Sequence, residues 1–244
     1  TQVTFTFADD ISVYDNGHTL DFKSGEQKNI TLNKGQSYAI KTLKGTYTGT
    51  QVTANNPIAT FTGNNCVNVP TSVRACDHVV EHIPDVSYWG MEYSFVPLSL
   101  RYKGDTVRIV AAFDDTVVRV NGKILSEINK GEWAEEIIEQ PSQISANHPI
   151  LVAQFSNGTE YDYAERGRDN IGDPFMMLLT AQRSYIKEYT FTTTQRNIQY
   201  NFANIAIDQT GLGSLILDGE LIDTSSFTLI PNSSILAGSI ELNE

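Results

Sequence analysis

The chain has 244 residues, with 17 Lys and Arg against 29 Asp and Glu, so its formal net charge is −12. An acidic surface repels phosphate backbones, which argues against a nucleic-acid partner, and no run approaches the about 20 apolar residues that a membrane span needs. The sequence has no signal peptide, begins at Thr1 without Met and ends at Glu244. With only 19% charged residues, it is typical of an extracellular or cell-surface module that is excised from a longer chain and tethered to neighbouring domains.

Alternation of apolar and polar residues dominates the sequence and predicts β-strands. Val3, Phe5 and Phe7 would share one face of the first strand. Three short windows fit a helix instead: residues 76–82, which Pro84 closes, and residues 133–139 and 175–179. Further strands are expected near residues 30–32, 38–40, 58–61, 107–111, 118–120, 150–155, 189–191, 198–207 and 215–217.

Turn residues separate these segments. Asn16-Gly17, Asn121-Gly122 and Asp218-Gly219 predict two-residue hairpins, because both central residues of such turns need positive φ. Lys34-Gly35 and Lys130-Gly131 are further turn signals. Many short strands at this spacing predict an all-β fold of antiparallel β-sandwich lobes.

The chain also repeats itself. Copies near residues 10–65 and 115–160 each contain an Asn-Gly hairpin, a Lys-Gly turn and an Asn-x-Pro-Ile run, and a partial third copy begins near residue 213. We therefore predict two related copies of about 100 residues and a partial third. The alternative is that β-proteins reuse the same turn chemistry. Since no linker separates the copies, we expect residues 1–244 to pack as one unit.

Two cysteines are present, Cys66 and Cys76, and nine residues lie between them. Structural zinc usually uses cysteine pairs that are two to four residues apart. An even number of cysteines in a β-rich chain that we expect to be secreted predicts one disulfide bond. Free thiols and zinc ligation are the alternatives.

Residues 78–82 read His-Val-Val-Glu-His, which is a zinc-protease motif when it lies on a helix. Pro84 would end such a helix after about two turns. We therefore interpret Asp77, His78 and Trp89 as a structural motif in which Asp77 hydrogen-bonds His78. A zinc hydrolase remains an alternative.

The longest polar segment is residues 157–173, and long loops on rigid β-scaffolds often carry function. Its flat tyrosines and forked arginines suit ligand contact; these are Tyr161, Tyr163, Arg166 and Arg168. Its carboxylates Asp162, Asp169 and Asp173 are candidate calcium ligands, although the EF-hand pattern is absent. No other cofactor is expected, and the alternative is a solvated loop that binds nothing.

Three acidic pairs, Asp9-Asp10, Asp114-Asp115 and Glu135-Glu136, have the residue type of a glycosidase acid and base. Most such pairs lie on solvated turns. A glycosidase is therefore kept only as an alternative.

A specific pattern of short residue blocks runs through the middle of the chain. It consists of Asn56-Pro57-Ile58, Phe61-Thr62-Gly63, Cys66, Val69-Pro70, Cys76-Asp77-His78, Val80-Glu81, Ile83-Pro84 and Trp89-Gly90, followed downstream by Gly104-Asp105, Arg108-Ile109-Val110, Asp115-Thr116, Pro149-Ile150-Leu151-Val152, Gln154-Phe155 and Gly172-Asp173-Pro174. This pattern resembles a known family, the N-terminal domain family of the IgG Fc-binding protein. The resemblance implies a role in binding and adhesion, not catalysis, in animal mucus proteins and microbial surface proteins. His82 departs from the family pattern, where Gln is usual.

The sequence thus predicts an extracellular adhesion or ligand-recognition module. Its partner would be a glycan or protein ligand on another cell or matrix, held by surface loops. A structural spacer that binds nothing is the first alternative. The two enzymes named above are the others, and we expect neither.

Overall fold

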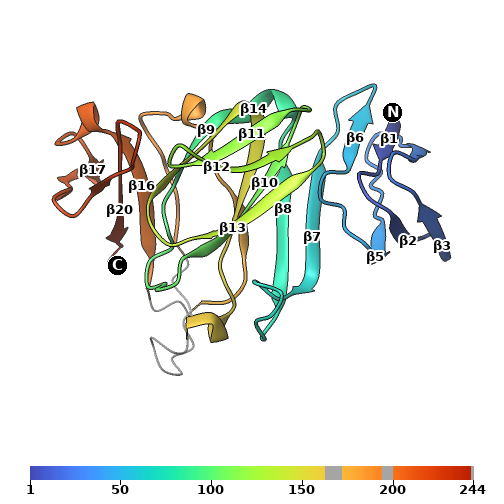
Figure 1. The fold of residues 1–244 in the computed structure, drawn as a ribbon, viewed down its shortest axis with the longest axis horizontal. Helices are drawn as coiled ribbons and strands as arrows, with labels where there is room; N and C mark the ends of the chain where they lie inside the picture. Colours follow the sequence, from blue (N-terminus) through green and yellow to red (C-terminus); the bar gives the residue numbers. More distant parts are fainter. Residues whose placement is uncertain (163–171, 194–199, 243–244) are drawn as a thin grey trace.

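The computed structural model describes residues 1–162, 172–193 and 200–242. Over these residues the protein is all-β, as predicted: its sheets are antiparallel, and its helical elements are 3-10 turns and not α-helices. Figure 1 shows three lobes in a row along the long axis, with the N-terminal lobe at one end and the C-terminal lobe at the other.

The N-terminal lobe packs two three-stranded sheets, β4-β1-β6 and β3-β2-β5, against each other. Its core contains Phe7, Ile11 and Val13, all buried. The ring of Phe7 lies 4.5 Å from that of Phe22. The strands are β1 (Gln2–Thr6), β2 (Ile11–Asp15), β3 (His18–Phe22), β4 (Gln27–Thr31), β5 (Lys41–Lys44) and β6 (Gln51–Ala54).

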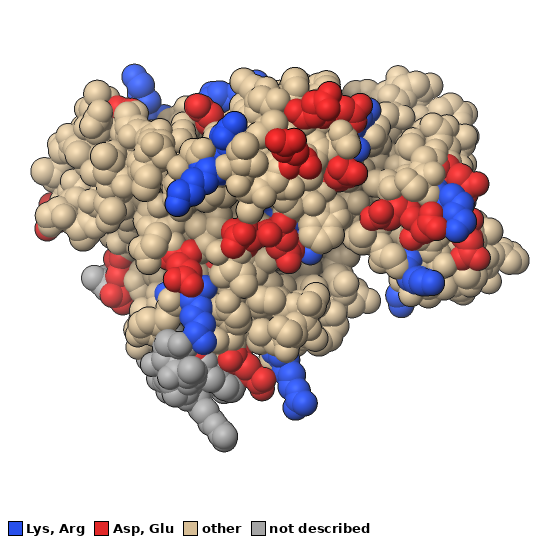
Figure 2. Space-filling view, viewed as in Figure 1, with Lys and Arg blue, Asp and Glu red and all other residues tan. Residues whose placement is uncertain are grey.

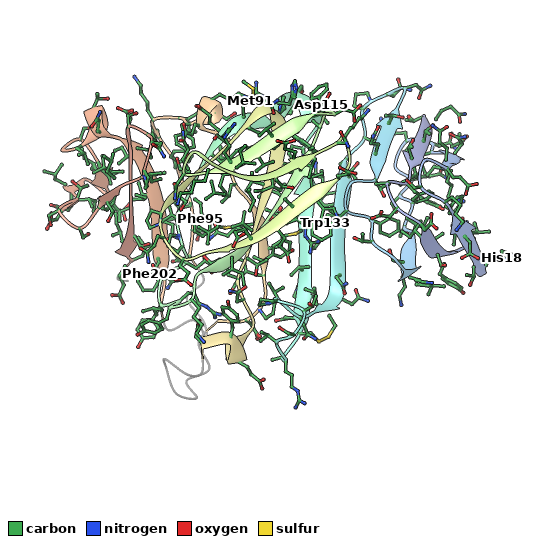
Figure 3. All side chains as sticks on the ribbon, in the orientation of Figure 1. His18, Met91, Phe95, Asp115, Trp133 and Phe202 are labelled. Atoms are coloured by element: carbon green, nitrogen blue, oxygen red, sulfur yellow. A yellow bond between two sulfur atoms is a disulfide. The ribbon has the colours of Figure 1, made fainter. Side chains whose placement is uncertain are left out.

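The central lobe is built around the long strand β14 (Ser142–Phe155), which pairs with β11 and β10 along one edge and with β9 and β15 along the other. Its apolar interior includes Phe95, which Figure 3 shows inside the lobe. The other strands are β9 (Gly90–Phe95), β10 (Asp105–Ala111), β11 (Thr116–Val120), β12 (Lys123–Ile128), β13 (Trp133–Ile138) and β15 (Met176–Leu178), with turns η2 (Thr159–Asp162) and η3 (Gln182–Ser184).

A separate two-stranded ribbon, β7 (Thr60–Val67) and β8 (Asp77–Ile83), lies beside the central sheet, and turn η1 (Val86–Tyr88) leads from it into β9. Residues 76–82, 133–139 and 175–179 were expected to be helical, and this expectation was wrong: they fall mainly in β8, β13 and β15. In β8 the side chains alternate, with His78, Val80 and His82 exposed and Val79 buried. Short apolar windows fit both periods, and pairing with a neighbouring strand decides between them.

The C-terminal lobe consists of the sheet β16-β20-β19 and the β17–β18 hairpin. Its small core, Ile230, Ile235 and Ala237, also takes in Val96 from the segment after β9. The elements are β16 (Phe202–Asp208), η4 (Gln209–Gly211), β17 (Ile216–Leu217), β18 (Glu220–Leu221), β19 (Thr228–Leu229) and β20 (Ile235–Glu241).

All three predicted hairpins are present: they connect β2 to β3, β11 to β12 and β17 to β18. In each turn both central residues have positive φ, for example 47° at Asn16 and 88° at Gly17. The strands expected near residues 38–40 and 189–191 did not form. The turn chemistry was therefore a more reliable guide than the shortest apolar runs.

The strand orders support the predicted duplication. In the N-terminal lobe, joining β5 and β6 into one strand would give the order β3-β2-(β5/β6)-β1-β4. The central sheet β12-β11-β14-β10-β13 has this same order. The correspondence pairs Gly131 with Gly25, and not with Gly35. The turns also share hydrogen bonds: Phe7 N to Glu26 O (3.1 Å) and Gly25 N to Phe7 O (2.8 Å) match Ala111 N to Glu132 O (3.1 Å) and Gly131 N to Ala111 O (3.0 Å). The duplication itself, and the number of copies, remain predictions.

The lobes touch through close backbone contacts. A Cβ on Gly49 would lie 1.7 Å from the carbonyl oxygen of Gly131, so only glycine allows this approach between the N-terminal and central lobes. On the other side, Asn232 Nδ2 donates to Asn121 O at 2.7 Å. These contacts support packing as one unit.

Carboxylates are prominent on the surface. Figure 2 shows groups of them on the upper centre and on the N-terminal end of one face, where Lys and Arg side chains also lie among them at the N-terminal end. This distribution agrees with the net charge of −12. No helix among the described residues is long and apolar enough to cross a membrane.

Candidate functional site

The segment 157–173, our first predicted contact region, begins on a buried polar base. Thr106 Oγ1 donates to Asn157 Oδ1 at 2.6 Å, and Asn157 Nδ2 donates to Gly104 O at 2.8 Å. Gly158 N donates to Val69 O at 2.6 Å, which ties the segment to the loop between the cysteines. The start of the segment is therefore fixed by the scaffold.

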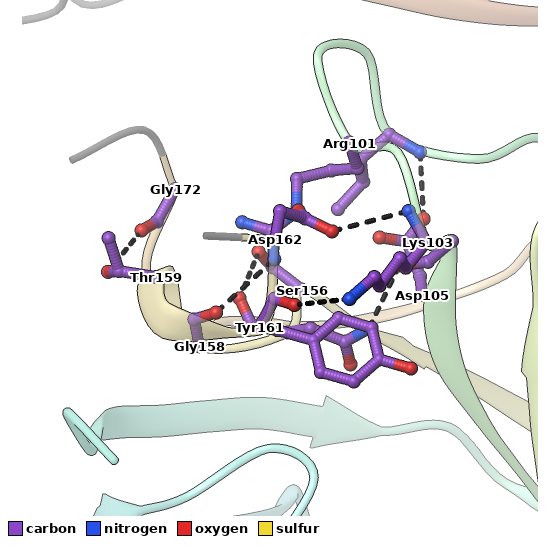
Figure 4. A network of polar contacts seen from close by, with 12 residues as sticks. Arg101, Lys103, Asp105, Ser156, Gly158, Thr159, Tyr161, Asp162 and Gly172 are labelled. Atoms are coloured by element: carbon purple, nitrogen blue, oxygen red, sulfur yellow. Dashed lines mark hydrogen bonds and ion pairs between the residues drawn. The ribbon is translucent and has the colours of Figure 1, made fainter. Parts of the chain in front are cut away.

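Arg101 lies at the centre of this base (Figure 4). Its Nε lies 2.8 Å from Asp162 Oδ2, and both side chains are only 3% exposed. Arg101 also lies against Gly172: a Cβ on Gly172 would be only 2.4 Å from Arg101 Nη1. Thr159 Oγ1 donates to Gly172 O at 2.7 Å. The two described ends of the segment, at residues 162 and 172, thus meet around one guanidinium.

The predicted ligand residues are only partly described. Tyr161 lies on η2, where burial raises the pKa of its phenol and the Lys103 ammonium lies 5.7 Å from its ring centre. Tyr163, Arg166 and Arg168 lie outside the described residues. The role of all four in ligand contact remains a prediction.

The predicted calcium ligands are not seen together. Asp162 pairs with Arg101, Asp169 lies outside the described residues, and Asp173 is exposed, with its Oδ1 3.4 Å from Thr159 Oγ1. Among the described residues, no group of three or more His, Cys, Asp or Glu side chains is placed to hold a metal. The calcium site stays a prediction, with Asp162 already held by a cation of the protein.

Cys66 and Cys76 form the predicted disulfide bond, with their Cα atoms 5.0 Å apart. His78 and His82 follow on β8, and four residues along a strand span about 13 Å. A zinc ion needs its ligand nitrogens about 2 Å away, so this strand cannot bring both imidazoles to one metal. Asp77 accepts from the His78 amide at 2.6 Å and lies 3.1 Å from its ring Nδ1; these contacts lower the pKa of Asp77.

The acidic pairs have structural partners. Asp10 and Asp114 accept from the backbone amides of the facing turns, Ser24 and Lys130, both at 3.1 Å. Glu135 holds Arg108 through two bonds of 2.9 and 2.7 Å. This geometry gives no support to the glycosidase that was kept as an alternative.

A groove of about 410 Å³ lies between β8 and β15, under turn η1. Polar, aromatic and apolar residues line it. Tyr88 stands at the rim with 70% of its surface exposed. The other lining residues include Glu81, His82, Trp89, Leu151, Met177, Leu179, Thr180 and Ser184.

The sequence block that resembles the family builds one wall of this groove. Asp85 Oδ1 accepts from Ser87 N at 2.9 Å and starts η1, and Trp89 Nε1 donates to Pro84 O at 3.1 Å, which fixes the indole. Gly90 is required because a Cβ there would lie 2.4 Å from Ala181 Cβ.

The opposite wall comes from a distant part of the chain and is tied to the first wall. Arg183 Nη2 donates to the carbonyl oxygens of Ser87 and Trp89, the latter at 2.6 Å. Tyr93 lies below, where its hydroxyl donates to Ile150 O at 2.6 Å. Both walls are therefore held in place before any ligand binds.

This groove was missed by the sequence analysis, although Trp89 was named as structural. Its composition suits binding, because aromatic residues such as Tyr88 and Trp89 lie beside polar residues such as Glu81, Thr180 and Ser184. The local sequence offered one signal, the pair of large aromatic residues Tyr88-Trp89 within the block that resembles the family.

Comparison with known proteins agrees with the resemblance. A human protein named IgGFc-binding protein is 24% identical over 233 residues, which cover 91% of this chain but only 4% of that protein. The chain thus spans a small fraction of this curated relative. No solved structure matches it. The family model described as IgGFc binding protein matches residues 1–243, and the chain therefore belongs to the IgGFc-binding protein family.

Proposed function

We propose that this chain is an extracellular ligand-recognition module of a larger adhesive protein, and that the groove under η1 contacts the ligand. The observation that carries the proposal is the origin of the groove. Its first wall is made by the residues on which the family resemblance rests, and it leaves the Tyr88 ring 70% exposed. A large aromatic side chain that is held out of the core beside polar groups is typical of a binding surface.

The comparisons support a binding role. The family description and the relative's name both denote binding to IgG Fc, and neither names an enzyme. A protein partner such as an antibody Fc region is therefore one candidate ligand, and a glycan on another cell or in the matrix is the other. The disulfide supports an extracellular location, because such bonds persist in oxidising compartments.

The test is a screen of the purified chain on a glycan array and on a protein array that includes IgG Fc. We expect a specific ligand whose affinity falls at least about tenfold in Tyr88→Ser, the loss of one well-placed aromatic contact. Tyr14→Ser is the matched control, since Tyr14 is also exposed but lies in the N-terminal lobe. A ligand that binds both variants like the wild type would remove the groove from the proposal.

A spacer that only displays other domains remains the second candidate, because the three lobes lie in a row (Figure 1). Silence on both arrays would favour it. The segment 157–173 remains a predicted second contact, and its fixed base supports that role.

A further inference from the structure

The edge of β8 that faces the groove pairs with none of the described strands. Among the described strands β8 pairs only with β7, and β15, which lies beside it, pairs only with β14. Residues of both strands line the groove. The groove therefore lies between two strands whose neighbouring edges form no ladder with each other.

The backbone donors of β8 on this edge are visible in the hydrogen bonds. His78 N donates to Asp77 Oδ1 at 2.6 Å, and His82 N donates to Glu81 Oε2 at 3.2 Å, so both amides have acceptors within β8 itself. Alternate residues of a strand direct their N–H and C=O groups to the same side. The register with β7 is unbroken from Val79 to Ile83 and shifts between Val79 and Asp77, where the extra residue lies in β7, so β8 itself keeps its alternation. The Val80 main chain therefore also points away from β7.

We propose that this edge binds an extended peptide segment of a protein partner by strand addition. The proposal deepens the proposed function and rests on it. Main-chain groups at His78, Val80 and His82 recur every second residue, about 6.6 Å apart, which is the repeat of an extended peptide. A pyranose ring offers no acceptors in that repeat.

The charges specify the peptide further. In the free protein Asp77 and Glu81 occupy two of the edge donors, and they stand four residues apart, about 13 Å along the strand. A pairing strand displaces these carboxylates, and basic side chains four residues apart on the peptide would compensate them. The net charge of −12 also favours a basic partner segment. Tyr88 at the groove rim would cover one peptide side chain.

The test is to select peptides that bind the purified chain from a displayed library of random peptides. Each peptide has about 12 residues, about twice the length of an average strand. Val80→Pro removes the central edge donor, and proline is tolerated where a strand N–H faces solvent. Val80→Thr keeps the donor and the shape and is the matched control. We expect selected peptides with Lys or Arg four residues apart, binding Val80→Thr like the wild type and Val80→Pro at least about tenfold more weakly.

Amide hydrogen exchange provides a second readout that needs no variant. The Val80 amide should exchange freely in the isolated chain and become protected when a selected peptide binds. Equal binding by both Val80 variants without such protection overturns strand addition. If the peptide library yields nothing while a glycan array yields a ligand, strand addition fails and the recognition function stands. If both yield nothing, the recognition function fails as well.

Discussion

Asp105 provides a direct test of the buried network beneath the segment 157–173. Its side chain is completely buried, and Oδ2 accepts from Leu98 N at 2.7 Å and from Gln154 Nε2 at 2.9 Å. Asp105 Oδ1 and Gln154 Oε1 have no hydrogen-bond partner among the described residues. Asp105→Asn keeps one oxygen for the two donors and replaces the unpaired oxygen by an N–H group, which can serve the Gln154 carbonyl.

The expected change in stability follows from the free-energy cost of leaving a buried polar group unpaired, which is about 1–3 kcal/mol. We expect Asp105→Asn to raise the free energy of unfolding by about 1 kcal/mol at pH 7.5, the net worth of one hydrogen bond. Asp105→Ala leaves both donors without an acceptor and should lower the free energy of unfolding by about 2–3 kcal/mol.

The pH dependence sharpens this test. Burial raises the pKa of Asp105 above its ordinary value of 3.8, and the bonds from Leu98 and Gln154 offset part of the rise. The folded protein therefore binds this proton more tightly than the unfolded chain. Its contribution to stability is present below the unfolded pKa and is lost as the pH rises through the folded pKa.

Urea unfolding of wild type and Asp105→Asn at a series of pH values measures the effect. The advantage of the asparagine variant should be smallest in acid, where Asp105 is protonated, and should grow as the pH rises. An asparagine variant that is less stable than the wild type, by an amount that grows as the pH rises, would refute the reasoning. It would mean that the carboxylate is needed in its charged form, opposite Arg101.

Three further predictions concern the same region. Gly172→Ala should lower the free energy of unfolding by about 1–3 kcal/mol, because Gly172 has φ +84° and its Cβ would meet Arg101; Gly213→Ala, at φ +82° with open space around it, isolates the backbone strain in thermal melts. Replacing Cys66 and Cys76 by Ser should cost about 3 kcal/mol in the chain-entropy model, and thiol titration of the native protein without reductant should find none free. The predicted calcium site requires a rise in melting temperature at millimolar calcium, and an unchanged melt would remove it.

Local chemistry predicted much of the fold. The Asn-Gly and Asp-Gly turns placed three hairpins correctly, because positive φ at two successive residues is a demand that few sequences meet. Alternation placed β1, β10 and β11. It failed at β8 and β13, whose short runs fit either period, since the pairing partner that decides between them lies elsewhere in the sequence.

The candidate site could be predicted only in part. The segment 157–173 was recognisable by its polarity, and its charges were assigned to ligand and calcium contact, with a solvated loop as the alternative. Instead, Asp162 is buried against Arg101. Nothing near Asp162 in the sequence indicates a partner 61 residues away. The groove could not be predicted for the same reason, because Arg183 and the residues around it contact Trp89 only in the folded chain.

The disulfide loop links the two regions that we associate with binding. Its carbonyl at Val69 accepts from Gly158 at the start of the polar segment, and its last cysteine, Cys76, directly precedes Asp77 on the free edge of β8. A covalent closure between these points limits the movement of the ribbon relative to the segment, which the packing of so few buried ribbon residues would not do alone. The cysteines are exposed and contribute little to a core, so we interpret the bond as a device that positions a binding edge, in addition to the stability that it provides.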